Sequence, residues 1–523
     1  MVNRRHFIKQ FGAFSLAFSG FGRALANSST VHQLIDQNYN KGYGPLIKDP
    51  NGILDLPKGF SYTIFSKYNE PMDDGLLVPA AHDGMAVFNG SNGNLIIIRN
   101  HELKGESHLI GGAFGPNLEL LDKVDKRLIY DTGNNGIPGQ GGTTTIIYDP
   151  VQKKVVRQFL SLAGTTINCS GGPTPWKSWI SCEETEIQAG EDWKKDHGYN
   201  FEVPALEKPQ ITKPVPLKSM GRFSHEAVAI DPRTGIAYQT EDEGNGLIYR
   251  FIPKVNGKFH QGGILQALCY KSEPSMDTRN WKENKIQLKE SYDVEWVTLN
   301  DVESPENDLR FRGAKNGAAI FARGEGMWFD KGKVYFTCTS GGKKKLGQLF
   351  IYTPSPNEGQ NNEKNNPGKI ELFVEPTDSK IMDMCDNITI APWGDMIICE
   401  DGKGTDYLLG IQPDGTIYNL SVTFQDLPGF ESVYVPNGLS AISSMITTSV
   451  YTQADPTQVI ITEPINTISC AKGTLKEPID NVKITKTKLP PNIHQFIFVF
   501  SLPLSSLNSR PLDFKVCIFL CLK

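Results

Sequence analysis

Short apolar segments that end in polar or acidic clusters recur along most of the chain. Each has the length of a strand and is rich in β-branched, aromatic or other apolar residues, and each follows a turn containing Gly or Pro. Five such segments are present: Asn94–Glu102, Trp179–Glu184, Ile236–Glu243, Val334–Ser340 and Met396–Asp401. The pattern predicts five strands, most of which carry a polar or acidic cluster at the C-terminal end.

A second apolar segment lies upstream of each turn and begins at another group of polar or small residues. These openings are Asp83-Gly84-Met85, Cys169-Ser170-Gly171, His225-Glu226-Ala227, Gly324-Glu325-Gly326 and Asp386-Asn387-Ile388. Opening and closing clusters are about 13 to 19 residues apart, which suits a hairpin of two short strands. Because a hairpin brings the start of one strand beside the end of the other, the two clusters of each repeat are expected to meet at one rim.

The arrangement of the five hairpins predicts the fold class. Hairpins separated by longer polar connections are typical of the blades of a β-propeller, in which residues from different blades meet on one axis. A β-sandwich also contains hairpins, but it would not explain acids at the same end of nearly every one. The 50 Gly and 33 Pro residues exceed average usage, as a turn-rich protein requires. We therefore predict an all-β protein of the β-propeller class.

Three polar connections and the C-terminal part interrupt this pattern. Residues 188–219 and 272–310 are charged, and residues 353–368 are of low complexity. We interpret all three as insertions between strands, and the last as a flexible loop. After Leu420 no further hairpin with an acidic rim is recognisable, and the apolar runs at 496–500 and 516–520 have no evident partner strands.

Charge and cysteine content exclude several classes of protein. The net charge is −5, and the only basic block is Lys343-Lys344-Lys345, which fits a solvated turn, so nucleic acid is not an expected partner. The nine cysteines show no CxxC pair and no zinc-finger spacing. An odd number argues against a disulfide framework and leaves at least one thiol for chemistry.

The N-terminus has the features of an export signal. Arg4-Arg5 precedes a short apolar stretch, and Ala24-Leu25-Ala26 provides a small-x-small cleavage site. This order is typical of a twin-arginine signal peptide over residues 1–26. We therefore expect the twin-arginine translocase as a partner during export and a periplasmic or secreted location for the mature chain.

The predicted rim concentrates acidic side chains. Like carboxylates that are brought together raise one another's pKa, and bound cations are the usual compensation. Oxygen-rich sites favour hard ions such as calcium or ferric iron, whereas the thiolate of Cys169 would suit iron and not calcium. The acids are Glu183, Glu184, Glu226, Glu241, Asp242, Glu243, Glu325, Asp386, Glu400 and Asp401. The set predicts a mixed metal site.

Other residues near the rim are assigned different roles. Arg323 lies two residues before Glu325, so an extended segment would place both side chains on one face, where a guanidinium could bind phosphate or balance the acids. Cys182 and Cys399 precede an acid within a strand and are interpreted as core residues. His225 is interpreted as a packing residue or a support for a ligand.

Four long blocks resemble the signature segments of PhoX-type alkaline phosphatases. They are T-I-N-C-S-G-G-P-T-P-W-K-S-W-I-S-C-E-E from Thr166, G-R-F-S-H-E-A-V-A-I-D-P-R-T-G-I-A-Y-Q-T-E-D from Gly221, F-A-R-G-E-G-M-W-F from Phe321 and C-D-N-I-T-I-A-P-W-G-D-M-I-I-C-E-D-G from Cys385. The block G-G-T-T-T at 141–145 and the leader also fit, so the resemblance covers roughly residues 1–410.

The resemblance implies a six-bladed propeller that hydrolyses phosphomonoesters with two ferric ions and several calcium ions bridged by an oxo group. It implies that Cys169 is the thiolate ligand of iron and that Arg323 binds the substrate phosphate. The candidate metal ligands are then Cys169, Glu183, Glu184, Glu226, Glu241, Asp242, Glu325, Asp386, Asn387, Glu400 and Asp401.

The chain departs from the family after residue 420. We expect a signal peptide at 1–26, a propeller phosphatase domain at 27–420 and a divergent segment at 421–523 that forms an atypical or incomplete last blade. Two alternatives stay open at this point. One is a calcium-dependent hydrolase such as a lactonase, which would need the acids but neither Cys169 nor Arg323. The other is a propeller that only binds, which an unclosed ring would favour.

Overall fold

The structure is a computed structural model that describes residues 42–104, 111–402 and 405–423 and five further strands. The predicted signal peptide at 1–26 lies outside the described residues. No helix in the described part of the chain has the length and apolar character needed to cross a membrane.

The five predicted hairpins are confirmed. In each, an antiparallel pair is joined by a short turn, and the polar residues named above lie at the open end. The pairs are β4 (His82–Asn89) with β5 (Leu95–His101), β8 (Asn168–Pro173) with β9 (Ser178–Glu183), β11 (His225–Ile230) with β12 (Ala237–Glu241), β16 (Gly324–Asp330) with β17 (Lys333–Cys338), and β20 (Cys385–Ile390) with β21 (Met396–Glu400).

Further strands extend each hairpin outward into a sheet. They are β6 (Gly141–Asp149) and β7 (Lys154–Thr165), β10 (Asn200–Pro204), β13 (Ile248–Pro253), β14 (Gly263–Tyr270) and β15 (Ser291–Thr298), β18 (Gln348–Thr353) and β19 (Lys369–Val374), and β22 (Tyr407–Ile411) and β23 (Ile417–Thr423). Two neighbouring sheets join where β15 pairs with β19. The N-terminal strands β2 (Leu54–Pro57) and β1 (Leu46–Ile47) continue the sheet of β20–β23 at its outer edge.

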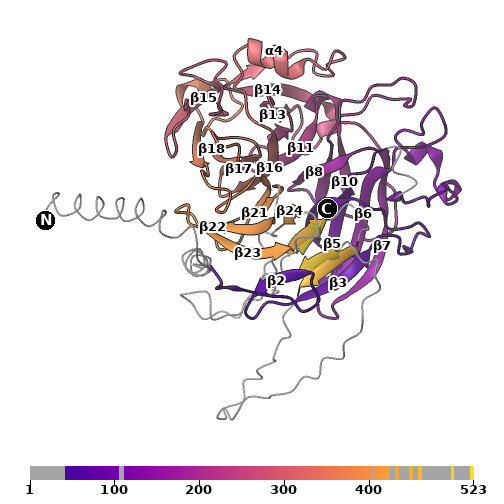
Figure 1. The fold of residues 1–523 in the computed structure, drawn as a ribbon. Helices are drawn as coiled ribbons and strands as arrows, with labels where there is room; N and C mark the ends of the chain where they lie inside the picture. The colour runs from indigo at the N-terminus through magenta and orange to yellow at the C-terminus, as the bar shows by residue number, and fades with distance from the viewer. Residues whose placement is uncertain are drawn as a thin grey trace, which may run out of the picture.

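The first strands of the sheets surround a common axis. β4, β8, β11, β16 and β20 contact one another in this order, and β24 (Phe430–Tyr434) contacts both β20 and β4. Figure 1 shows the sheets around this centre, with β8, β11, β16 and β24 nearest to it. The fold is therefore a β-propeller, as predicted, while the number of six blades stays an implication of the family resemblance.

The apolar core follows from this arrangement. A sheet packed between two neighbours is buried on both faces, so its inner strands are continuous apolar runs and do not alternate. β5 is an example, since all seven of its residues are buried and its first four, Leu95 to Ile98, form an uninterrupted apolar run. At Gly326 in β16 a Cβ atom would lie 2.5 Å from the backbone nitrogen of Ile388, so only glycine permits this approach of two inner strands.

The described strands of the C-terminal part form one sheet with an N-terminal strand. The order is β24, β25 (Thr447–Tyr451), β27 (Phe496–Val499), β28 (Phe519–Leu522), β26 (Thr457–Ile461) and β3 (Tyr62–Lys67). The two apolar runs without evident partners contain β27 and the first half of β28, and these strands pair with each other. Sequence reasoning missed this pairing because it joins segments far apart in the chain. The predicted domain boundary at residue 420 stays a prediction.

Parts of the polar connections are more ordered than expected. β10 and β15 lie within connections interpreted as insertions between strands, so that interpretation is wrong for these residues. The predicted flexible loop 353–368 is fastened to the sheet. Its Glu358 accepts a hydrogen bond of 2.6 Å from the buried Arg250, which also binds Glu363.

A short helix, α4 (Leu309–Lys315), follows β15, and it caps the outer side of the same part of the molecule.

Candidate metal centre and active site

A β-bulge at the start of each inner strand positions one candidate ligand side chain. In all five hairpins the register shifts within the first residues of the inner strand, and the shift leaves two residues without a paired partner. A bulge bends its strand and redirects a side chain. The first residues of the five bulges are Asp83, Cys169, Glu226, Glu325 and Asp386. Every repeat therefore supplies one potential metal ligand from the same backbone feature.

A second residue of each repeat is placed by a backbone hydrogen bond. The residue after the strand end donates its N–H to the carbonyl that precedes the inner strand, over 2.7–3.1 Å in all five repeats. The donor residues are Glu102, Glu184, Asp242, Thr339 and Asp401. The accepting residues Ala81, Ile167, Arg323 and Met384 have a positive φ of 48–56°, a left-handed conformation that turns the chain into the bulge.

Neighbouring sheets hold the bulges in place. The Asn100 side chain donates to the carbonyl of Cys169 over 2.9 Å, and the Thr240 hydroxyl donates to the carbonyl of Glu325 over 2.6 Å. The Thr337 hydroxyl donates in the same way to the carbonyl of Asp386. These bonds connect consecutive sheets, so the bulges at Cys169, Glu325 and Asp386 are each positioned partly by the sheet before them.

Four of the five bulge side chains, those of Cys169, Glu226, Glu325 and Asp386, line one pocket of about 270 Å³. It is almost entirely polar and contains seven carboxylates and a thiol. The lining residues are Glu102, Lys104, Ile167, Cys169, Glu184, Glu226, Asp242, Arg323, Glu325, Asp386 and Asp401. Seven of the predicted ligands and Arg323 are thus brought together.

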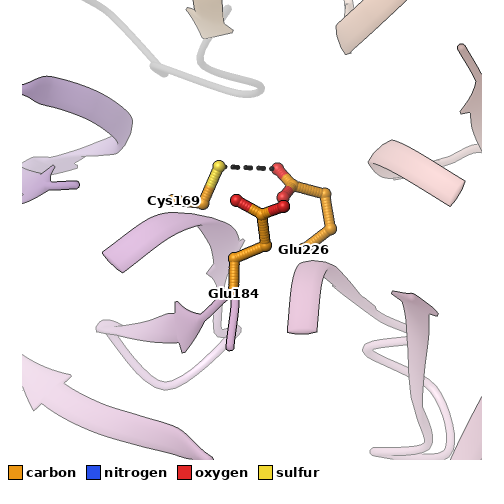
Figure 2. Close-up of side chains that lie close together, drawn as sticks. All are labelled: Cys169, Glu184 and Glu226. Carbon is orange, nitrogen blue, oxygen red and sulfur yellow. Dashed lines mark hydrogen bonds between the residues drawn. The ribbon is translucent and has the colours of Figure 1, made fainter. Parts of the chain in front are cut away.

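Two groups of donor atoms lie close enough to share a metal ion. Cys169, Glu184 and Glu226 form one, and Glu226, Glu325 and Asp386 form the other, each with its donor atoms within 4.8 Å of one another. Figure 2 shows the first three side chains converging, with the Cys169 thiol donating to Glu226 over 3.3 Å. The second oxygen of Glu226, Oε2, is buried and has no hydrogen-bond partner among the described residues.

The negative charge of the pocket carboxylates is not balanced by the described cationic side chains. Burial raises the pKa of Cys169, Glu184 and Glu226 well above their usual values, and neighbouring acids raise it further. Burial, followed by Asp242, raises the pKa of Glu325 to about 8, although Arg323 opposes this. The carboxylates cannot all be ionised without additional cations. An unpartnered buried oxygen, a carboxylate-rich lining and one thiol fit bound metal ions.

Arg323 lies against two of the pocket acids. Its Nε and Nη2 bind both oxygens of Asp242 at 2.8 and 2.7 Å, and Nη2 also binds Glu325 at 2.8 Å. The two side chains are in contact, but not through the extended segment considered from the sequence. Arg323 has a φ of 56° and precedes β16, so the segment is not extended there. Glu325 is the largest cause of the raised pKa of Arg323.

Three predicted ligands, Glu183, Glu241 and Glu400, are not in the pocket lining. Each is the last residue of its strand, so its side chain points to the opposite face from that of the acid that follows. Glu400 accepts backbone N–H bonds from Asp383 at 2.7 Å and Tyr407 at 2.9 Å.

Glu183 and Glu241 are bound in a similar way. Glu183 accepts from the N–H groups of Thr166 and Gly198 at 3.1 and 2.9 Å, and Glu241 accepts from the N–H of Leu247 at 3.0 Å. These carboxylates fasten strand ends to adjacent segments.

Asn387 is also absent from the lining. It is buried and donates to the Ser170 hydroxyl over 2.9 Å, so it joins the bulge of β20 to that of β8, a strand that is not its neighbour around the axis. Cys182 and Cys399 are fully buried in apolar clusters, as predicted. His225 packs against Phe223 with ring centroids 3.6 Å apart, which confirms its packing role.

Sequence reasoning left three residues out of the candidate set: Asp83, Glu102 and Lys104. Asp83 occupies the first bulge, and its Oδ2 lies 3.6 Å from the Cys169 thiol. Glu102 and Lys104 line the pocket directly. Asp83 and Glu102 occupy the same positions in their hairpin as Glu226 and Asp242 do in theirs, and this equivalence is the signal that would have found them.

Fold and pocket define the class: a β-propeller with a cluster of acidic donors and one thiol, suited to metal ions, at one end of its axis. The chain belongs to the PhoX family of alkaline phosphatases, since the family described as Alkaline phosphatase PhoX matches residues 41–431. This match includes every residue of the pocket.

A solved structure of a PhoX protein supports the fold. Pseudomonas fluorescens PhoX in complex with vanadate, a transition state analogue, is similar with a TM-score of 0.55 and 16% identity, over 75% of this chain and 91% of that chain. A gluconolactonase from Xanthomonas campestris has a TM-score of 0.31 and 10% identity, over 74% and 92% of the two chains. No curated protein matches the chain.

Proposed function

We propose that this protein is a metal-dependent alkaline phosphatase that hydrolyses phosphomonoesters and releases inorganic phosphate. The observation that carries the proposal is the meeting of Cys169, Arg323 and seven carboxylates in one pocket of a PhoX-family chain. The Pseudomonas fluorescens relative is described with vanadate as a transition state analogue, which supports phosphoryl transfer as the reaction class.

The residues suited to holding metal ions are those with converging donor atoms. Cys169, Glu184 and Glu226 offer a thiol beside carboxylates, which suits Fe³⁺, whereas Glu226, Glu325 and Asp386 offer only oxygen, which suits Ca²⁺. When bound, such ions withdraw electron density from a phosphoryl group and lower the pKa of water. Asp83, Glu102, Asp242 and Asp401 are close enough to complete the coordination of further ions.

Arg323 is the residue proposed to bind the phosphoryl group. Its Nε and Nη2 are used by Asp242 and Glu325, while its Nη1 has no hydrogen-bond partner among the described residues. The side chain is 33% exposed, so Nη1 can donate to a phosphoryl oxygen that enters the pocket. The two carboxylates fix the guanidinium plane before substrate binds, which reduces the entropy lost on binding.

A calcium-dependent lactonase would use the acids but would need neither Cys169 nor Arg323. Both residues contact the acidic cluster directly, which favours the phosphatase. A propeller that only binds would retain metal without turnover, so assays with 4-nitrophenyl phosphate and with a lactone distinguish all three functions.

Elemental analysis of the purified protein tests the metal assignment. We expect iron and calcium together, and a visible absorption band from thiolate-to-iron charge transfer. Cys169→Ser should abolish this band, whereas Cys399→Ser should leave it intact because Cys399 is buried in the core. Full activity in protein that contains no iron would refute the assignment.

Export by the twin-arginine translocase, to the periplasm or beyond, is proposed from Arg4-Arg5. Replacement of both residues by lysine should leave the precursor in the cytoplasm. Undiminished export of this double variant, measured by cell fractionation, would reject the proposal.

A further inference from the structure

Lys104 is a second cation of the pocket to which the proposed function gives no role. Lys104 and Arg323 are the two basic side chains among the described residues of the lining. Arg323 is paired with two carboxylates, whereas no carboxylate of the described residues lies within 4 Å of the Lys104 ammonium. The Lys104 side chain is also exposed, so its charge is available to a ligand.

Hydrogen bonds fix the backbone next to Lys104, whereas the Lys104 side chain is exposed. The N–H of Glu102 donates to the Ala81 carbonyl over 2.7 Å. The carbonyl of Leu103 accepts from the N–H of Ile167 at 3.0 Å and from the Thr166 hydroxyl at 3.1 Å. The Leu103 side chain is 4% exposed. These contacts fix the root of Lys104 at the pocket edge, while its four-carbon stem can reach a substrate.

The size of the pocket decides which part of a substrate Lys104 meets. A volume of about 270 Å³ corresponds to about nine water molecules at ~30 Å³ each. Metal ions and a phosphoryl group would occupy most of this space. The leaving group of a phosphoester must then extend past the rim, where the exposed lysine lies.

We infer that Lys104 selects phosphoesters whose leaving group carries a second negative charge, such as another phosphate or a carboxylate. This inference rests on the proposed function. Seven carboxylates line the pocket, so an anionic leaving group needs a local cation to offset their repulsion. Lys104 supplies that cation at the rim, where the phosphoryl-binding Arg323 is already engaged by Asp242 and Glu325.

The experiment compares phenyl phosphate with 4-carboxyphenyl phosphate, two substrates that differ by one carboxylate. Lys104→Met should lower kcat/KM for the carboxylated ester about fivefold more than for phenyl phosphate, the size expected of one exposed ion pair. Lys104→Arg should keep the wild-type ratio because it keeps the charge. The matched control is Lys254→Met, at an exposed lysine directly after β13 and outside the pocket lining. This control should leave kcat/KM unchanged for both substrates. Added salt should reduce the wild-type preference for the carboxylated ester, measured as the ratio of the two kcat/KM values.

Two outcomes would overturn the inference. An equal loss on both substrates would mean that Lys104 contacts the phosphoryl group itself, and no loss on either would make it a solvated lysine. If the metal-loaded wild-type protein hydrolyses neither ester, the proposed function fails separately. Calorimetric affinities of benzylphosphonate and 4-carboxybenzylphosphonate for the metal-loaded wild type and Lys104→Met then decide the role of Lys104 without catalysis.

Discussion

Adjacent acids at three strand ends have opposite environments. The last residue of each strand is a carboxylate bound by backbone N–H groups, and the next residue faces the pocket. The three pairs are Glu183-Glu184, Glu241-Asp242 and Glu400-Asp401. Amino-acid type does not distinguish their members. The face of the strand does, because consecutive side chains point in opposite directions.

The two sets of acids also differ in what compensates their charge. The strand-end carboxylates accept hydrogen bonds from backbone N–H groups, as Glu400 does from Asp383 and Tyr407, and the second oxygen of Glu241 lies 3.6 Å from the Arg310 guanidinium. The pocket carboxylates face mainly one another, and Glu226 has a buried oxygen with no partner among the described residues. A buried carboxylate left in this state is costly for a fold and useful for binding a cation. The comparison therefore separates stability from ligand binding, residue by residue.

The largest expected effect comes from the shared pocket carboxylate. Glu226→Gln should lower phosphatase activity at least about a hundredfold and reduce the metal content, because two groups of donors lose a common member. The metal-free variant should unfold at no lower a denaturant concentration than metal-free wild type, since repulsion between buried carboxylates is relieved. Elemental analysis and denaturant titration check both statements.

The matched variant is Glu241→Gln, in the strand-end set. It should keep the metal content and lower the free energy of unfolding by about 1–3 kcal/mol, because a buried hydrogen-bonded carboxylate is lost. A loss of metal in Glu241→Gln, or unchanged metal in Glu226→Gln, would break the distinction between the two sets.

Substitutions of Arg323 test how much its positive charge in the pocket contributes to catalysis. Arg323→Ala should lower kcat/KM for 4-nitrophenyl phosphate about tenfold to a hundredfold, because donors aimed at developing charge are lost. Arg323→Lys should restore only part of this, since an ammonium does not reproduce the planar pair of donors. Metal content should be unchanged in both variants. A fully active alanine variant would reduce Arg323 to a residue that balances the acids.

His197 gives the strand-end set a dependence on pH. It binds Glu183 at 2.6 Å and lies 3.5 Å from Asp131. Burial would lower the pKa of His197, but attraction to Glu183 and Asp131 raises it to about 9. Because the folded-state pKa is raised above the usual 6.5, the protonated imidazole stabilises the fold fully below about pH 6.5, and this contribution is lost as the pH rises through 9.

The free energy of unfolding should therefore separate wild type from His197→Gln by at most about 3 kcal/mol near pH 6, and by much less above pH 9. His225→Gln is the control. Burial lowers the pKa of His225 to about 3, so it stays neutral in the folded protein, and because the unfolded imidazole titrates near 6.5, its effect should not depend on pH between about 7.5 and 9. A pH-independent difference for His197→Gln would show that its charge contributes nothing.

The smallest expected effect concerns the bonds between sheets. Thr240→Val keeps the shape of the side chain but removes the hydroxyl that binds the Glu325 carbonyl and accepts the N–H of Ala227 at 2.9 Å. The free energy of unfolding should fall by about 1 kcal/mol, the value of a typical hydrogen bond. A large loss of activity with unchanged stability would instead mean that this bond orients Glu325 for catalysis.

Much of the architecture followed from the sequence, because short apolar runs bounded by turns specify hairpins locally. The hairpins, the rim and most pocket residues were predicted in this way. What failed depended on information that is not local. The bulge is a register shift between two strands, and the left-handed backbone at Arg323 has no signal in its residue type. The pairing of β15 with β19 joins residues far apart in the chain.

The choice between neighbouring acids could be made only in part. Alternation alone predicts that Glu400 and Asp401 point in opposite directions. It does not predict which of the two side chains faces the axis. That depends on where the strand ends, and on a backbone hydrogen bond between Asp401 and Met384. The strand-end acids were therefore included among the metal ligands, whereas Asp83 was left out.

The repeated bulge has a consequence for how such a site can diversify. The same backbone turn presents Asp83, Cys169, Glu226, Glu325 and Asp386, so the donor at any one repeat can be exchanged without rebuilding its sheet. Sulfur occupies one of these five interchangeable positions and oxygen the other four. Descendants of such a chain can change metal preference through single substitutions at one repeat, while the other repeats preserve the geometry. Repetition of one backbone turn thus separates the choice of donor atoms from the fold of the sheets.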